Sequence, residues 1–138
     1  MTQDFKHMFN YDSVTSEFLP FGGMELNSVA YIHSDGCLDR IILFFDDESL
    51  VIQAERDYDT VQLSRVPNSE IVSLSDLSEP HDIWSKYIGQ KFSWGWVMIN
   101  QQNYLDGIIL SFGSIAPNVL LNVAASSIYV FELSEITD

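Results

Sequence analysis

Alternation of hydrophobic and polar positions predicts a series of short β-strands separated by turns. The clearest case is a pair of apolar runs at residues 94–99 and 105–112, which flank the polar tetrad at residues 100–103. This pattern predicts a β-hairpin that contains a high density of aromatic side chains. Similar runs occur upstream at residues 24–33, 38–45, 50–55 and 60–64. Consecutive strands joined by short turns are expected to pair antiparallel.

The second half of the chain resembles the first. A shift of 67 residues places 38–45 on 105–112 with six of eight positions identical, and it aligns Val29 with Trp96. We therefore predict an internal repeat of two antiparallel four-stranded meanders, within residues 22–64 and 89–134, joined by a connection at residues 65–88. Such a mainly β chain forms a sandwich or a small barrel, and an α+β fold with one curved sheet is the alternative.

Two segments predict short helices. Asp12 and Ser13 can cap a helix over residues 14–19, which Pro20 and then Gly22 and Gly23 would end. In the connection, Ser78 is expected to cap a helix of two to three turns that ends at Gly89. Its apolar side, which includes Trp84, is expected to cover part of the sheet.

Composition limits the classes of partner. The 138 residues are 46% hydrophobic, which is sufficient for one domain over residues 1–138 with its own core. Twenty acidic residues against six basic ones give a formal net charge of −14, which repels nucleic acids and anionic membranes and favours a basic partner or simple solubility. No apolar run approaches the roughly 20 residues that cross a bilayer. A single Cys37 and the absence of a leader pattern predict a cytoplasmic protein.

Two aspartates are candidates for catalysis. Asp39 and Asp106 occupy corresponding places, and period-two counting puts each on the face of the apolar residues that follow it. An approximate two-fold axis would bring the carboxylates together as an acid–base pair. The alternative is that each begins a strand and accepts main-chain hydrogen bonds at a turn.

The predicted hairpin is the main candidate for a binding site. Alternation places Trp94, Trp96 and Met98 on one face of its first strand, where they either pack in the core or contact a partner. Amide and aromatic side chains follow, and such groups recognise peptides or sugars unless they form a solvated loop. The candidate binding residues are Trp94, Trp96, Asn100, Gln101, Gln102, Tyr104 and Asp106.

Motifs for other chemistry are missing from the sequence. The three histidines and Cys37 have no metal-ligand spacing, and neither a glycine-rich phosphate loop nor a nucleophile motif occurs. We therefore expect no metal, no cofactor and no enzymatic activity.

The pattern Trp94-x-Trp96 followed by Asn100-Gln101-Gln102-x-Tyr104-x-Asp106-Gly107 resembles an uncharacterised family of small acidic bacterial proteins. This resemblance implies a bacterial source and a soluble single domain, and it implies no activity. By composition alone, the chain is also similar to bacterial immunity proteins that neutralise toxins. The leading hypothesis is a non-enzymatic protein-binding domain, with an immunity-like or inhibitor-like role as one form of it. The alternatives are a ligand-binding barrel or hydrolase that uses the paired aspartates, and a homodimerising module.

Overall fold

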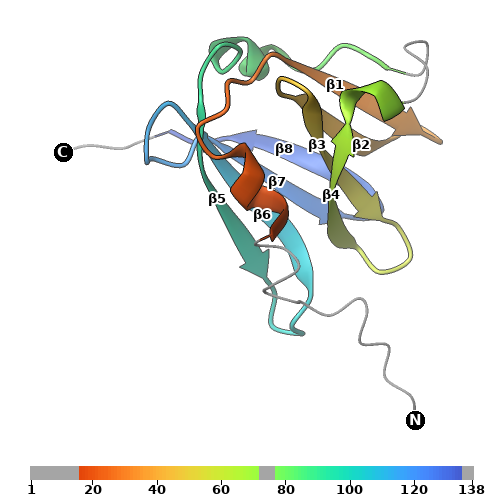
Figure 1. Cartoon of the computed structure of the whole chain (residues 1–138). Helices are drawn as coiled ribbons and strands as arrows, with labels where there is room; N and C mark the ends of the chain where they lie inside the picture. The colour runs from red at the N-terminus through yellow and green to blue at the C-terminus, as the bar shows by residue number, and fades with distance from the viewer. Residues whose placement is uncertain (1–15, 72–76, 135–138) are drawn as a thin grey trace.

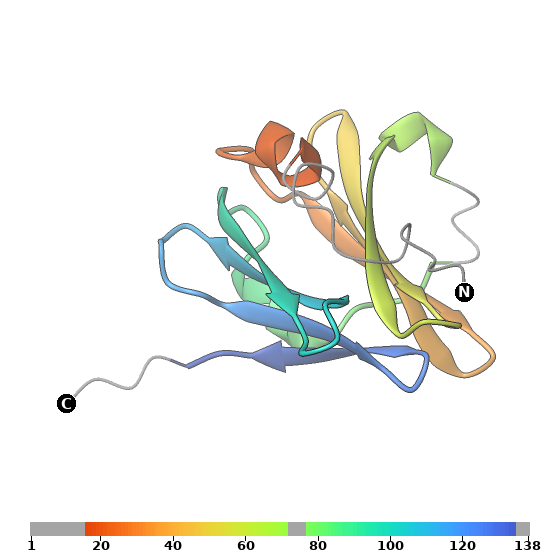
Figure 2. The ribbon, with the colours of Figure 1, turned by 90° about the horizontal axis from the view of Figure 1, so that it is seen from below.

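The fold consists of two four-stranded antiparallel sheets that form separate layers (Figures 1 and 2). The computed structural model describes residues 16–71 and 77–134. The first sheet contains β1 (Ser28–Ser34), β2 (Cys37–Phe44), β3 (Glu48–Glu55) and β4 (Thr60–Pro67) in that order. The second contains β5 (Phe92–Ile99), β6 (Leu105–Phe112), β7 (Val119–Ala124) and β8 (Ser127–Glu132). The predicted mainly β fold is confirmed in its sandwich form, because the sheets do not close into a barrel. The α+β alternative is wrong.

The core lies between the sheets and takes one face from each. Ile41 and Leu43 of β2 are fully buried, as are Ile108 and Leu110 at the corresponding places of β6. These residues belong to one hydrophobic cluster that includes residues of both sheets. Neither sheet can therefore bury its apolar face without the other.

Corresponding positions of the two sheets contact each other. Glu25 and Lys91 form an isolated antiparallel bridge between the segments that precede β1 and β5. The main-chain N–H of Ser126, in the β7–β8 turn, donates to the Asp59 carboxylate in the β3–β4 turn, over 2.9 Å. Each contact therefore joins a segment of the first meander to a segment of the second.

A β-bulge interrupts the ladder of each sheet at the same place. In the first sheet Ile32 pairs with Arg40 and the next residue pairs with Leu38, so that Asp39 is the extra residue. In the second sheet the same irregularity leaves Asp106 unpaired. A bulge changes which face the residues beyond it occupy, so period-two counting does not hold across Asp39 or Asp106.

The helical segments differ from the predicted ones. Residues 16–18 are helical and continue into η2 (Leu19–Phe21), which contains Pro20 and has Gly22 as its C-cap. The helical turn therefore ends at the predicted glycine and not at Pro20. The predicted start at residues 12–13 lies outside the described residues. A further turn, η3 (Asn68–Glu70), follows β4.

The helix predicted in the connection is only η5 (Asp82–Lys86), a 3-10 helix without a side-chain cap. Ser78 does not cap it, because its main chain pairs with Tyr31 of β1 instead. The buried Trp84 confirms that the apolar side of η5 covers the core.

Candidate functional site

The predicted hairpin forms from β5 and β6, and it turns its two tryptophans away from the core. Gly95 and Val97 pair with the buried residues Leu110 and Ile108, so the residues that alternate with them lie on the opposite, outer face of the second sheet. Trp94 is 54% exposed there, and Trp96 is half-buried.

The alignment of Trp96 with Val29 is one residue out of register. Val29 pairs with Leu43, and the residue that pairs with the corresponding Leu110 is Gly95. Trp96 therefore has no counterpart in the core of the first sheet. A shift of one residue exchanges the two faces of a strand, so this difference decides where the tryptophan points.

Apolar side chains continue from the tryptophans across all four strands. Trp96 pairs with Ile109, Ile109 with Leu120, and Leu120 with Phe131 of β8. The next row runs from Met98 through two smaller residues to Tyr129. We call this surface the aromatic face, and it consists of Trp94, Trp96, Met98, Ile109, Leu120, Tyr129 and Phe131.

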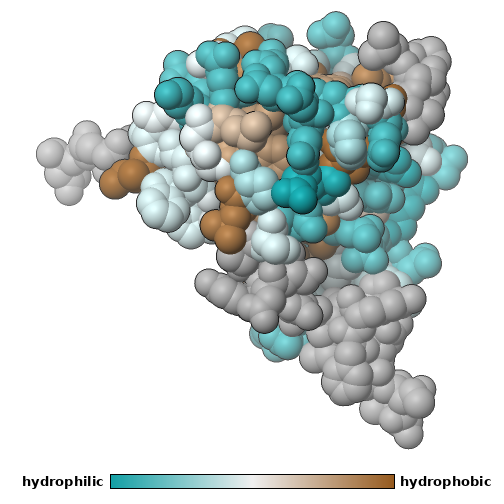
Figure 3. Space-filling view, viewed as in Figure 1, coloured by the Kyte–Doolittle hydropathy of each residue, from teal (hydrophilic) through white to brown (hydrophobic). Residues whose placement is uncertain are grey.

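The aromatic face is both exposed and free of charge. Phe131 and Tyr129 are 51% and 46% exposed. None of the residues in its rows is charged, although 19% of the whole chain is. On the side of the molecule shown in Figure 3, by contrast, most of the described surface is hydrophilic or neutral and hydrophobic residues form small separate groups.

Sequence reasoning missed the half of the aromatic face that β6, β7 and β8 provide. The available signal was the alternation in β8, where Tyr129 and Phe131 are separated by Val130. That alternation does not say which side chains face the core. Only the pairing of β8 with β7 places the two aromatic rings on the same face as the tryptophans.

The amide tetrad divides into structural and exposed residues. The Oδ1 atom of Asn100 accepts hydrogen bonds from the main-chain N–H groups of Gln102 and Tyr104, over 2.9 and 3.2 Å. Asn103 has a φ of 68°, which the turn requires. The side chains of Gln101 and Gln102 are exposed, Tyr104 is half-buried, and both glutamines are available for contact. The turn itself therefore explains two of the four amides.

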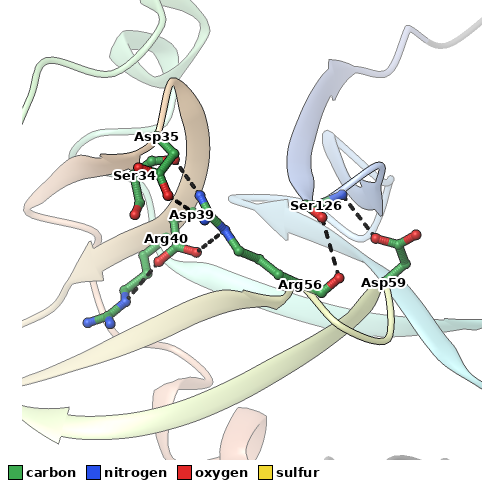
Figure 4. Close-up of polar contacts among 7 residues, drawn as sticks. All are labelled: Ser34, Asp35, Asp39, Arg40, Arg56, Asp59 and Ser126. Carbon is green, nitrogen blue, oxygen red and sulfur yellow. Dashed lines mark hydrogen bonds and ion pairs between the residues drawn. The ribbon is translucent and has the colours of Figure 1, made fainter.

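Asp39 and Asp106 are not brought together. The Asp106 carboxylate accepts a hydrogen bond from Asn100 Nδ2 over 3.4 Å, at the hairpin end of the second sheet. Asp39 lies in the first sheet, where Arg40 Nε is 3.3 Å and Arg56 Nε is 3.6 Å from its carboxylate oxygens (Figure 4). Carboxylates in separate sheets with separate partners do not form an acid–base pair.

The surroundings of Asp39 form a structural cluster rather than a reactive one. Arg56 donates to the Asp35 carboxylate over 3.1 Å and to the main-chain oxygen of Ser34, which ties the β3–β4 turn to the β1–β2 turn (Figure 4). The hydrogen bond to Asp35 raises the pKa of the Arg56 guanidinium. Ser126 joins this cluster because its hydroxyl donates to the Arg56 carbonyl. The cluster therefore holds three turns of both sheets together.

A second polar network lies under η5. The indole N–H of Trp84 donates to the Tyr31 hydroxyl over 2.7 Å, and that hydroxyl lies 3.1 Å from Nδ1 of His81. Burial raises the pKa of Tyr31. Since Trp84 and Tyr31 are both almost fully buried, the network fixes the connection against β1.

Residues 16–71 and 77–134 contain neither a cluster of metal-ligating side chains nor a membrane-spanning helix. No three His, Cys, Asp or Glu side chains of these residues lie close enough together to hold a metal ion. Within the same ranges, no helix has both the length and the apolar character that a membrane span requires.

Comparison with protein families gives a match over most of the chain. A family model described as a family of unknown function (DUF6334) matches residues 9–137. No curated protein and no solved structure matches the chain.

Proposed function

Because the chain belongs to the DUF6334 family, whose function is unknown, we propose its function from its own surface. The protein is a non-enzymatic binding module that docks a basic protein partner on the aromatic face. The observation that carries this proposal is an uncharged aromatic surface across all four strands of the second sheet, on a chain with a formal net charge of −14.

The chemistry of the aromatic face suits a protein–protein contact that excludes water. Interface centres are enriched in aromatic residues and methionine and depleted of charge. The polar groups within this face already have partners, since Ser111 Oγ accepts from the Trp94 N–H over 3.0 Å and Asn122 Nδ2 donates to the Asp106 carbonyl over 3.0 Å. A partner that covers the face therefore leaves these groups hydrogen-bonded and gains from burying the aromatic rings.

Charge argues for a basic partner and against a second copy of the chain. Two copies would each bring a formal charge of −14 to the same interface and repel each other. The acidic chain attracts a basic protein over a longer range than apolar contacts act, and this attraction raises the association rate at low salt. The aromatic face then supplies the short-range contact, and Gln101 and Gln102 at its hairpin end add hydrogen bonds at the rim.

Affinity capture from a lysate of the source organism tests the proposal when it is followed by direct binding of the identified protein. We expect the captured protein to be basic and its purified form to bind the wild-type chain more tightly at low salt. Trp94→Ala and Phe131→Ala should each weaken binding by about tenfold or more, as is typical of central aromatic contacts.

The matched control is Tyr58→Ala, because Tyr58 is 45% exposed, much like Tyr129, but lies in the β3–β4 turn and not on the aromatic face. This variant should bind as the wild type does. If it loses as much affinity as Phe131→Ala, or if the aromatic-face variants bind normally, the proposed surface is wrong.

A further inference from the structure

β8 is an edge strand, and the hairpin that precedes it determines where its main-chain groups point. Ala125 and Ser126 form a two-residue turn with φ values of 49° and 67°. Ala124 and Ser127 flank this turn, and the pair that flanks such a turn exchanges main-chain hydrogen bonds. Along an antiparallel ladder, hydrogen-bonded pairs then alternate with pairs that are not hydrogen-bonded. The main-chain N–H of Leu133 donates to the carbonyl of Asn118, the residue before β7, over 2.8 Å, which fits the same alternation.

The residues of β8 that lie between its hydrogen-bonded positions therefore direct their main-chain N–H and C=O groups away from β7. These residues are Ile128, Val130 and Glu132 in β8. No other described residue accepts from or donates to the outward main-chain groups of Ile128 and Val130. Unpaired main-chain groups at a sheet edge need water or an added strand as their partner.

The other three edges are protected. Ser78 pairs with Tyr31 and covers part of the β1 edge. The β5 ladder has two irregularities, and β4 contains Arg65 and ends at Pro67. Bulges, prolines and charged residues are the usual means by which proteins block strand addition. β8 has a regular ladder and carries no charge before Glu132.

We propose that β8 accepts an extended segment of the partner as a fifth strand of the second sheet. This inference rests on the proposed function, since the added strand would continue the aromatic face beside Tyr129 and Phe131. The outward N–H and C=O groups of Ile128 and Val130 would pair with the main chain of the segment. Alternate side chains of the segment would then lie beside the two aromatic rings.

The occupant is a basic extended segment of another protein. Its main chain matches the unpaired groups, and its charge complements the acidic chain. Edge-to-edge pairing of two copies would satisfy the same main-chain groups, but it would bring two formal charges of −14 together. A homodimer formed through β8 is therefore an outcome that would overturn the proposal.

The probe is a capped synthetic hexapeptide of alternating valine and lysine, and the readout is amide hydrogen exchange of the full chain. With saturating peptide, the exchange of the Ile128 and Val130 amides should slow by about tenfold or more. Protection at β4 instead, or no protection at β8, would overturn the proposal. So would slow exchange of both amides without peptide, together with a dimer in light scattering.

Two methylated peptides separate main-chain pairing from charge attraction. One carries N-methyl groups on the valines and the other on the lysines, and successive N–H groups of a strand point to opposite sides. Only one of the two should lose binding, by about tenfold or more, because only one set of N–H groups faces β8. Equal binding of both peptides would mean that the main chain is not recognised.

Substitutions in β8 provide an independent test. Val130→Pro removes the outward N–H, whereas Val130→Ala truncates the side chain but keeps the outward N–H. We expect peptide binding to fall for the proline variant only, with far-ultraviolet circular dichroism used to confirm that both variants are folded. If Trp94→Ala weakens binding of the natural partner but Val130→Pro does not, the proposed function stands and strand addition fails. If neither variant changes binding, both are wrong.

Discussion

The contact between Gly95 and Phe18 gives the sharpest test of how β5 is positioned. A Cβ atom on Gly95 would lie 2.8 Å from Cδ1 and 2.9 Å from Cε1 of Phe18, whereas ordinary contacts begin at 3.4 Å. The Phe18 side chain is only 9% exposed, and its ring centroid lies 6.2 Å from that of Phe92. The ring therefore has little room to retreat, and Gly95→Ala should lower the free energy of unfolding by about 1–3 kcal/mol.

The sign of this effect should reverse when the ring is removed. Phe18→Ala alone is expected to cost about 3–5 kcal/mol because it leaves a cavity in the core. On that background the Cβ of Gly95→Ala meets no ring, and alanine in place of glycine within a strand should stabilise by about 0.5–1 kcal/mol. Urea unfolding of the two single variants and the double variant, followed by tryptophan fluorescence, measures the coupling. Equal effects of Gly95→Ala on both backgrounds would refute the argument.

Gly107 provides the control for this cycle. A Cβ there would lie 2.9 Å from Met98 Sδ but also 2.8 Å from the main-chain oxygen of Leu121. Met98→Ala removes the first clash and leaves the second, so it should not rescue Gly107→Ala. Rescue at Gly107 as complete as at Gly95 would mean that general loosening, and not the specific contact, relieves the strain.

Three further predictions concern single interactions. Tyr31→Phe leaves the buried indole N–H of Trp84 without its acceptor and should cost about 1–3 kcal/mol in thermal or urea unfolding. Asn100→Ala removes the acceptor of two main-chain N–H groups in the hairpin turn and should cost about 1 kcal/mol, measured in the same way. Lys86 donates to Glu132 over 2.6 Å and lowers the pKa of that carboxylate, so the pair stabilises the fold above the carboxylate's unfolded pKa and the effect is lost as pH falls through its native pKa. Unfolding of Lys86→Ala and the wild type should therefore differ at neutral pH and converge in acid, and a difference that persists in acid would contradict this.

Strands and turns were predictable wherever side chains determine local conformation. Asp35 and Gly36 have φ values of 54° and 79°, and Asp-Gly is a sequence that favours positive φ in a two-residue hairpin turn. Ala125 and Ser126 adopt positive φ values without such a signal, because the pairing of β7 with β8 imposes them. Tertiary pairing, rather than local preference, sets the length of that hairpin.

The faces of the strands were less predictable than the strands themselves. A bulge at Asp39 allows Leu38 and Ile41, three residues apart, to share the core. The corresponding bulge at Asp106 has the same effect on the second sheet. The sequence contains no signal for the bulge, so counting by two did not allow for it and suggested a catalytic pair that the structure does not form.

The outer faces of the two sheets show which residues the fold itself requires. Both sheets bury equivalent core residues, so both meet the same packing demand. In the first sheet the row beside the bulge consists of Arg40, Gln53 and Gln62, whereas the corresponding row of the second sheet ends in Tyr129. The first sheet forms with a polar row at this place, so pairing and core packing do not demand an aromatic residue there. A contiguous exposed aromatic face that folding does not need is best explained by contact with another molecule, so the proposed interface lies on the second sheet and not on the first.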